Sequence, residues 1–142
     1  MGWAPLKTAN YQLEENPMRK LSVVAIAATI ALAGTSAGWA AGDAAKGKRV
    51  FNKCKACHSL KAGKRKIGPS LFGVMGRKAG TSKKFKYSKA LKNSGLTWTD
   101  ENLDKYITKP RKFIKGTKMT FRGLKKKADR DNLIAFLKKA AK

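Results

Sequence analysis

The chain has 142 residues, enough for one domain, and its 33 basic and 8 acidic residues give a net charge of +25. Such a charge attracts acidic surfaces, and nucleic acid, anionic membranes and acidic proteins all fit it. With only two cysteines and one histidine, the chain lacks the roughly four Cys or His ligands of a structural zinc site, which excludes a zinc-finger protein.

The N-terminal part is typical of an export signal. A short basic stretch at residues 18–20 precedes an apolar run over residues 21–33 and a zone of small residues over 34–41. We therefore expect residues 18–40 to be a signal peptide that is cleaved after Ala40. Residues 41–142 would then form the mature domain.

Two alternatives stay open for this N-terminal part. Residues 21–41 are almost continuously apolar, and their length is close to the roughly 20 residues that span a bilayer, so they could instead remain as an uncleaved anchor. Residues 1–17 have no signal character, and a misassigned start upstream of Met18 would explain them. We expect the domain in the periplasm, either released or anchored to the inner membrane and facing the periplasm.

The mature domain is expected to begin with a helix over residues 42–51. The Asp43 carboxylate is suited to cap its N-terminus, and Val50, Phe51 and Cys54 share an apolar face at helical spacing. The helix leads directly into residues 54–58, so both cysteines should project from its C-terminal end.

Residues 54–58 (CKACH) have the C-x-x-C-H spacing at which a haem is attached covalently. Two thiols can add across the two vinyl groups of a porphyrin, and the following histidine can bind the iron from one side. A thioredoxin-like motif would need surrounding strands, which the sequence does not predict, and a disulfide would leave the histidine unexplained. We predict one covalent haem c, attached through Cys54 and Cys57 and ligated by His58.

The rest of the sequence predicts loops and two further helices. Residues 59–80 are rich in Gly and Lys, and a loop of this length is unusual in a compact domain unless it wraps something. Helices are expected over residues 99–108, capped by Thr99 and ended before Pro110, and over residues 129–141. The predicted fold class is all-α, with three main helices and loops around one haem. The core is so thin that we expect the haem-free chain to be unfolded or molten.

The iron ligand opposite His58 decides what the haem can do. No second His or further Cys exists, and Met1 and Met18 lie outside the mature domain. Met119 lies 61 residues beyond His58, between two predicted helices, whereas Met75 lies only 17 residues beyond it. We therefore predict Met119 as the second ligand and core packing for Met75.

Several stretches in order, beyond the C-x-x-C-H motif, resemble a class I cytochrome c of the mitochondrial and bacterial c2-like type. The resemblance covers nearly all of residues 42–142. The matching stretches are residues 42–51, 54–58, 68–71, 72–78, 96–98, 106–110, 116–119 and 133–138. It implies a small cytochrome c fold and a soluble one-electron carrier of a respiratory chain, not an enzyme.

The resemblance also implies roles for individual residues. It makes His58 and Met119 the axial ligands, with the carbonyl oxygen of Pro69 accepting the His58 ring N–H. The other residues implied to surround the haem are Arg77, Tyr87 and Trp98 near the propionates, Tyr106 hydrogen-bonding toward the Met119 sulfur, Thr117 in the ligand loop, and Phe121 over the exposed edge. The basic residues implied to lie around that edge and to dock the partner are Lys53, Lys66, Arg111, Lys112, Lys118, Lys125 and Lys126.

Two positions depart from the family pattern. Lys115 stands where the family usually has Pro, and Leu91 stands where an Asn often supports an internal water network. We therefore expect an altered water network and a looser ligand loop, in which Met119 is easier to displace.

Ligands on both faces leave no open iron position, so the expected function is outer-sphere electron transfer at an exposed haem edge. The expected partners of this monomer are acidic redox proteins such as a quinol–cytochrome c oxidoreductase, a terminal oxidase or a periplasmic dehydrogenase, because a basic surface steers acidic ones. The alternative is a haem c enzyme or ligand sensor, peroxidase-like, which needs a displaceable Met119. A nucleic-acid or membrane-binding module would leave the haem unexplained, and no nucleic-acid motif appears.

Overall fold

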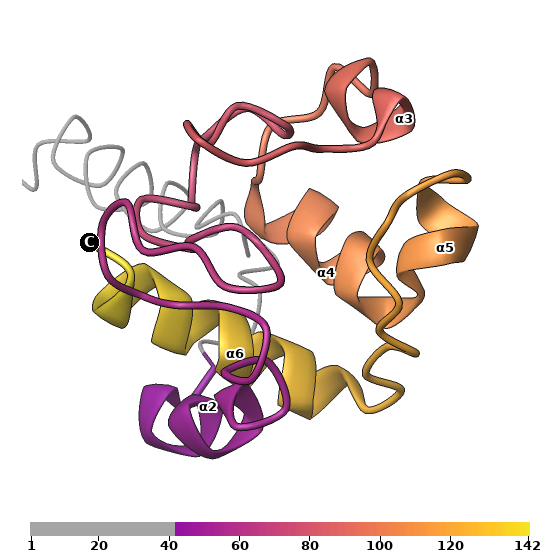
Figure 1. Cartoon of the computed structure of the whole chain (residues 1–142). Helices are drawn as coiled ribbons and strands as arrows, with labels where there is room; N and C mark the ends of the chain where they lie inside the picture. Colours follow the sequence, from indigo (N-terminus) through magenta and orange to yellow (C-terminus); the bar gives the residue numbers. More distant parts are fainter. Residues whose placement is uncertain (1–41) are drawn as a thin grey trace, which may run out of the picture. The chain divides into compact units, whose positions relative to one another are not determined.

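The computed structural model describes residues 42–142, so the expectations for residues 1–41 lie outside the described part. The helices within it are α2 (Ala44–Phe51), α3 (Lys89–Lys92), α4 (Asp100–Thr108), α5 (Pro110–Phe113) and α6 (Lys127–Ala140) (Figure 1). In this range the only β-pairing is an isolated antiparallel bridge between Lys78 and Thr97. The predicted all-α class is confirmed.

The three predicted helices correspond to α2, α4 and α6, and their ends differ from the predicted ones by two residues or fewer. The sequence pattern does not predict α3 and α5, because four residues are too few to show a helical period. Local chemistry explains both of these short helices. The Ser88 hydroxyl caps α3 by accepting from the Leu91 amide, and Pro110 starts α5, where a missing amide proton costs nothing.

Side-chain caps begin two of the longer helices, as predicted. The Asp43 carboxylate accepts from the backbone amides of Ala45 at 2.8 Å and Lys46 at 3.0 Å at the start of α2. The Thr99 hydroxyl accepts from the Asn102 amide at 3.2 Å at the start of α4. Each cap satisfies helix-end donors that have no partner within the helix.

The first and last helices, α2 and α6, cross in direct contact (Figure 1). Gly47 makes the close crossing possible, because a Cβ at this position would overlap the Asn132 carbonyl oxygen of α6. Beside the crossing, the rings of Phe51 and Phe136 lie with their centroids 5.4 Å apart, and Leu133 is only 2 % exposed. The packing partner of α2 is therefore α6.

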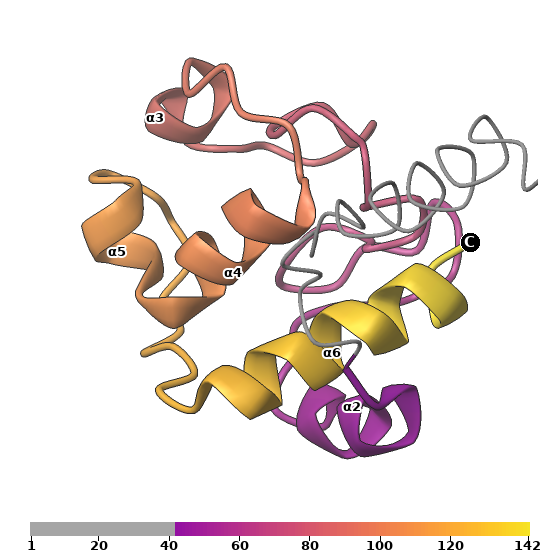
Figure 2. The same ribbon diagram turned by 180° about the vertical axis from the view of Figure 1, so that it is seen from behind.

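The remaining helices and loops pack around the α2–α6 pair. α4 contacts both α6 and α5. In both ribbon views α2 lies on one side of α6, and the long connection between α2 and α3 lies largely on the other (Figure 2). Within residues 42–142 no helix combines the length and apolar character needed to cross a lipid bilayer.

Candidate haem-binding site

A cavity of about 660 Å³ lies between the helices and the loops. Its volume is within the range of roughly 300–1,000 Å³ typical of small-molecule and cofactor sites. Its apolar wall includes Leu71, Val74, Leu91, Leu103, Ile107, Leu133 and Leu137. These side chains come from the loops and from α3, α4 and α6, so tertiary packing forms the cavity.

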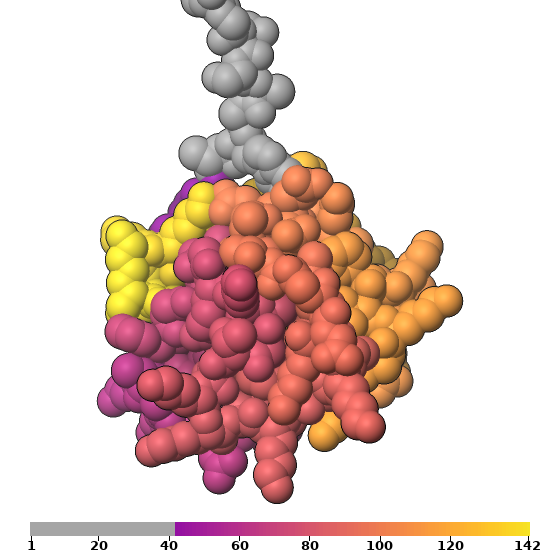
Figure 3. Space-filling model, turned by 90° about the horizontal axis from the view of Figure 1, so that it is seen from above, coloured from indigo at the N-terminus to yellow at the C-terminus, as the bar shows by residue number. Residues whose placement is uncertain are grey.

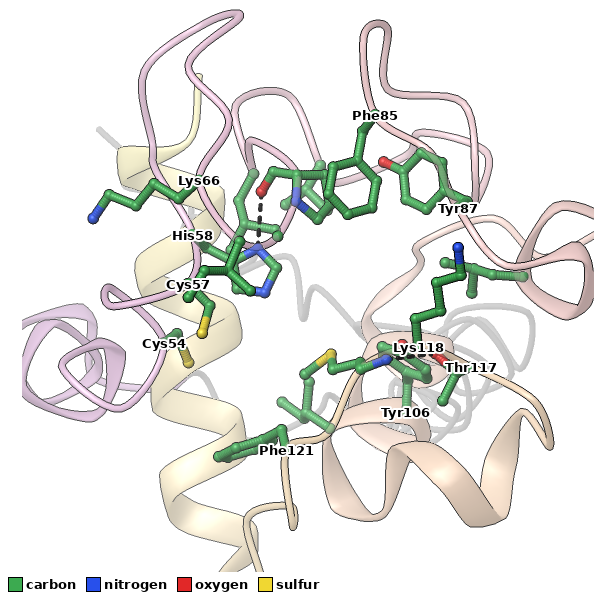
Figure 4. Close-up of a pocket in the computed structure, with 18 of the residues that line it drawn as sticks. Cys54, Cys57, His58, Lys66, Phe85, Tyr87, Tyr106, Thr117, Lys118 and Phe121 are labelled. Carbon is green, nitrogen blue, oxygen red and sulfur yellow. Dashed lines mark hydrogen bonds between the residues drawn. The ribbon is translucent and has the colours of Figure 1, made fainter.

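Cys54 and Cys57 lie next to each other at the edge of this cavity (Figure 4). The backbone turns directly after α2, with the amides of Cys57 and His58 donating to the Cys54 carbonyl at 3.0 and 2.9 Å. Both thiols are free of a disulfide. Burial, and secondly the neighbouring Cys57, raise the pKa of the Cys54 thiol to about 11. The Cys54 thiol therefore stays protonated at neutral pH, and it would have to lose its proton to add to a vinyl group as the thiolate nucleophile.

The His58 ring faces the cavity. One ring nitrogen makes a hydrogen bond, and the other is available to a ligand. Its Nδ1 lies 2.8 Å from the Pro69 carbonyl oxygen (Figure 4). Since a carbonyl only accepts, Nδ1 carries the proton and Nε2 has a free lone pair. Burial lowers the pKa of His58 more than the Pro69 hydrogen bond raises it, and the charge of Lys66 lowers the pKa further. The ring is therefore held in a neutral tautomer whose Nε2 lone pair is available to a metal ion.

Tyr106, Thr117 and Lys118 lie across the cavity from His58 (Figure 4). The Tyr106 hydroxyl is hydrogen-bonded to the Thr117 hydroxyl at 2.9 Å, and the Thr117 oxygen lies 3.4 Å from the Met119 amide, which donates to it. Met119 is part of the cavity wall, whereas Met75 packs against the buried core outside it. The structure thus places a thioether in the segment that faces His58.

Comparisons with known proteins bear on this arrangement. The family model described as cytochrome c matches residues 44–141. The chain belongs to the cytochrome c family. Cytochrome c2 of Rhodoblastus acidophilus is 55 % identical over 98 residues, covering 68 % of this chain and 92 % of that protein. Cytochrome c2 of Blastochloris viridis is 47 % identical over 122 residues, covering 85 % of this chain and 93 % of that protein.

A solved structure gives the same result for the fold. Cytochrome cH from Methylobacterium extorquens superposes with a TM-score of 0.65 at 45 % identity, covering 68 % of this chain and 98 % of that one. The predicted cytochrome c fold is therefore confirmed. Together with the C-x-x-C-H spacing of Cys54, Cys57 and His58, family membership shows that this cytochrome holds one covalent haem c.

The residues present fit that group. The two thiols at the cavity edge, the free His58 nitrogen and the apolar wall are what a porphyrin attached by two thioethers requires. The residues predicted around the haem all line this one cavity, namely Pro69, Arg77, Tyr87, Trp98, Tyr106, Thr117, Met119 and Phe121. The structure therefore brings together residues that are up to 67 positions apart in the sequence.

Three details differ from a simple transfer of family roles. The Tyr106 hydroxyl has Thr117 as its hydrogen-bond partner, where the resemblance implied the Met119 sulfur. The Arg77 guanidinium donates to the backbone carbonyls of Phe72 at 2.6 Å and Ser70 at 3.1 Å. Leu91 is buried and lines the cavity, so an apolar side chain stands where the resemblance implied an Asn.

The seven predicted docking residues fall into two groups. Lys53, Lys66 and Lys118 line the cavity, and two of these have protein partners. Lys53 lies 3.9 Å from the Asp129 carboxylate, and the Lys66 ammonium donates to the Lys55 carbonyl. The exposed residues away from the cavity wall are Arg111, Lys112, Lys125 and Lys126. Their role in docking stays a prediction.

Sequence reasoning missed two contributors to this site. Gly68 leaves room for the His58 ring, because a Cβ there would lie 2.5 Å from His58 Cε1. Phe85 lines the cavity and packs edge-on against Tyr87, with ring centroids 4.8 Å apart. The two-residue spacing of Phe85 and Tyr87 in a Lys-rich loop was the signal available for Phe85. Gly68 belongs to the matching stretch 68–71, but that stretch does not show its role beside His58.

Proposed function

We propose that this cytochrome carries single electrons between redox proteins, with His58 and Met119 as the two iron ligands. One observation carries the proposal: the neutral His58 imidazole, with Nε2 free, and Met119 line the same cavity, with two thiols at its edge. Membership of a family whose members include proteins named cytochrome c2 supports the carrier role.

The proposed mechanism depends on the side chains that would keep substrate and oxygen away from the iron. The haem supplies one iron that gains or loses one electron. His58 and Met119 would both hold the iron, which would leave no open site for substrate or oxygen. The Met119 thioether and the apolar wall both disfavour the extra positive charge of the oxidised state, which raises the reduction potential. Because the Pro69 carbonyl fixes the His58 ring, little rearrangement accompanies the change in charge.

The surface charge fits acidic partners. The basic residues Lys53, Lys66, Arg111, Lys112, Lys118, Lys125 and Lys126 would steer such a partner to the haem edge, where Phe121 lies. Candidate partners are a quinol–cytochrome c oxidoreductase, a terminal oxidase or a periplasmic dehydrogenase. Charge of this kind raises the association rate more than the final affinity. Electron-transfer rates should therefore fall as salt increases, and a rate unchanged by salt would contradict steering.

The decisive experiment compares Met119→Ala with Met75→Ala as the matched control. The ferric holoprotein should show a Met–iron charge-transfer band, which Met119→Ala removes and Met75→Ala retains. Loss of the band in Met75→Ala alone would overturn the ligand assignment.

The same spectra separate the carrier from a haem enzyme or ligand sensor. Reduced wild-type protein should not bind carbon monoxide, and Met119→Ala should bind it. Carbon monoxide binding by the wild type would favour the enzyme or sensor instead.

We also propose that residues 18–40 direct export to the periplasm and are removed after Ala40, leaving residues 41–142. This proposal rests on the sequence pattern alone. Mass spectrometry of the purified holoprotein would test it, and a mature chain that retains residues 21–33 would indicate an anchored protein.

A further inference from the structure

The acidic side chains in the described part of the chain lie in helices or at a helix cap, and each is paired. The six Asp and Glu residues of residues 42–142 lie in α4, in α6 or at the cap of α2. Each forms an ion pair: Asp43 with Lys46, Asp100 with Lys138, Glu101 with Lys105, Asp104 with Arg130, Asp129 with Lys53, and Asp131 with Lys127. These pairs leave most of the basic residues without an acidic neighbour.

The loops, in contrast, are basic and contain no acidic residues between positions 44 and 99. Residues 44–99 contain 16 Lys or Arg and no Asp or Glu. We define the loop face as six exposed residues of two loops and α3, namely Lys64, Arg65, Lys83, Lys84, Lys86 and Lys89. None of the six belongs to an ion pair described for residues 42–142. The loop face therefore carries unbalanced positive charge.

The loop face is one surface because its segments are joined. The Arg65 guanidinium donates to the Lys84 carbonyl at 3.0 Å and links the two loops. A Cβ at Gly80 would lie 3.0 Å from Lys92 Cα, so the second loop packs on α3. Figure 3 views this side, where the magenta to salmon segment covers much of the surface and long side chains project from it. The two loops and α3 thus hold these charges on one surface.

An exposed apolar side chain adjoins these charges. Ile67 is 81 % exposed, more than the other large exposed hydrophobic residues described, Phe72 and Phe113. It lies two residues from Arg65, and Ile67, Arg65 and Lys86 also line the haem cavity, as Lys66 does. An apolar residue beside a basic cluster is the arrangement by which a protein interface combines an anchor with charge complementarity.

We propose that the loop face and Ile67 form a second docking surface for an acidic protein, sharing no residue with the docking set proposed above. A cluster of basic side chains with an apolar residue beside it is complementary to an acidic protein surface that contains an apolar depression. Ile67 would enter an apolar depression within the acidic patch. Ile67, Arg65 and Lys86 border the haem cavity, but the proposal gives the iron no role and does not depend on which residues bind it.

The test measures peptide binding to the isotope-labelled holoprotein by NMR. The probe is a synthetic peptide with four glutamates on each side of a central leucine, compared with an all-glutamate peptide of equal length. The loop variant combines Lys64→Gln, Lys83→Gln, Lys84→Gln and Lys89→Gln. The matched control removes the same charge elsewhere through Arg111→Gln, Lys112→Gln, Lys125→Gln and Lys126→Gln.

We expect the amides of Lys64, Ile67, Lys83 and Lys89 to shift on titration. The affinity fitted from the loop-face amides should fall about tenfold in the loop variant, as the sum of four modest charge contacts, and about twofold or less in the control. Ile67→Ser should remove any preference for the leucine-containing peptide. An unchanged visible spectrum and melting temperature would show that each variant is folded.

Three results would overturn the proposal. One is the absence of shifts at the loop face, and another is equal weakening in both variants, which would mean that only net charge matters. The third involves vesicles of phosphatidylglycerol and phosphatidylcholine. If vesicle binding depends on the loop-face lysines and peptide binding does not, the surface recognises lipid and not protein.

Discussion

Arg130 of α6 donates from Nε to Oδ1 of Asp104 in α4 at 2.6 Å, and the two side chains are only 11 % and 14 % exposed. The same guanidinium donates from Nη1 to the backbone carbonyls of Leu124 at 3.0 Å and Lys125 at 2.9 Å. One arginine therefore joins α4, α6 and the segment that returns from the ligand loop.

Removing one partner of this ion pair should be costly. Asp104→Ala leaves the Arg130 charge mostly buried without its counter-ion, and we expect it to lower the free energy of unfolding by about 3 kcal/mol. Denaturant unfolding of the holoprotein checks this value. Glu101→Ala is the control, because the exposed Glu101–Lys105 pair should contribute little. Equal losses in the two variants would show that burial of the Asp104 pair is unimportant.

Gly47→Ala should destabilise the protein although alanine favours helix. The added methyl would overlap the Asn132 carbonyl oxygen, a backbone atom that cannot turn away. We expect a net loss of about 1–3 kcal/mol as α2 and α6 separate, against a propensity gain of about 1 kcal/mol. Thermal unfolding with Ala45→Gly as a propensity control measures both effects. A stabilised Gly47→Ala would mean that the helices cross less closely than described.

Gly68→Ala should disturb the His58 ring. The new Cβ would lie 2.5 Å from Cε1 and 2.9 Å from Nδ1, so the ring must tilt and the bond to Pro69 must lengthen. We expect a lower reduction potential or a partly high-spin ferric spectrum. Gly63→Ala is the control, because it meets no atom within 4 Å and has only the strain of φ +66°. A normal spectrum in Gly68→Ala would rule out the positioning role.

Lys115→Pro should stabilise the ligand loop. Residues 114–117 form a turn closed by the Thr117 amide and the Ile114 carbonyl at 3.1 Å, with Gly116 at φ +85°. In a turn with glycine third, proline suits the second position, which is Lys115. Ile114 is extended (φ −123°, ψ 94°), as a residue before proline requires.

We expect Lys115→Pro to add about 0.4–1 kcal/mol to the free energy of unfolding. The ferric Met–iron band should also persist to higher pH than in the wild type. Lys115→Ala separates the effect of the ring from that of charge removal. If both variants behave alike, the missing proline does not loosen the loop.

Acid should weaken the start of α2 through Asp43. Hydrogen bonding to the Lys46 amide is the main cause that lowers the pKa of Asp43 below its ordinary 3.8. Because the folded-state pKa is depressed, the stabilisation is complete above about pH 4 and is lost as pH falls through the folded value. Asp43→Asn keeps a cap that does not titrate. The difference in melting temperature between wild type and Asp43→Asn should therefore shrink or reverse below pH 4, and a constant difference would contradict the linkage.

The sequence alone determined the chemistry of this protein, because that chemistry depends on residues adjacent in the chain. Cys54, Cys57 and His58 indicate a covalent haem by their spacing, and Asp43 and Thr99 mark two helix starts through local capping. The three longer helices follow from apolar periods that a linear pattern contains. Four-residue helices such as α3 are too short for such a period, so the pattern did not predict them although local capping supports them.

Only the tertiary structure decided how distant residues meet. Gly68 and His58 are ten residues apart, and nothing local shows that one makes room for the other. The Arg130–Asp104 pair joins two helices whose exposed-looking charges give no sign of burial. The loop face required the Arg65–Lys84 hydrogen bond to become a single surface. Contacts of this kind depend on how helices and loops pack around a shared cavity, which local propensity and spacing do not encode.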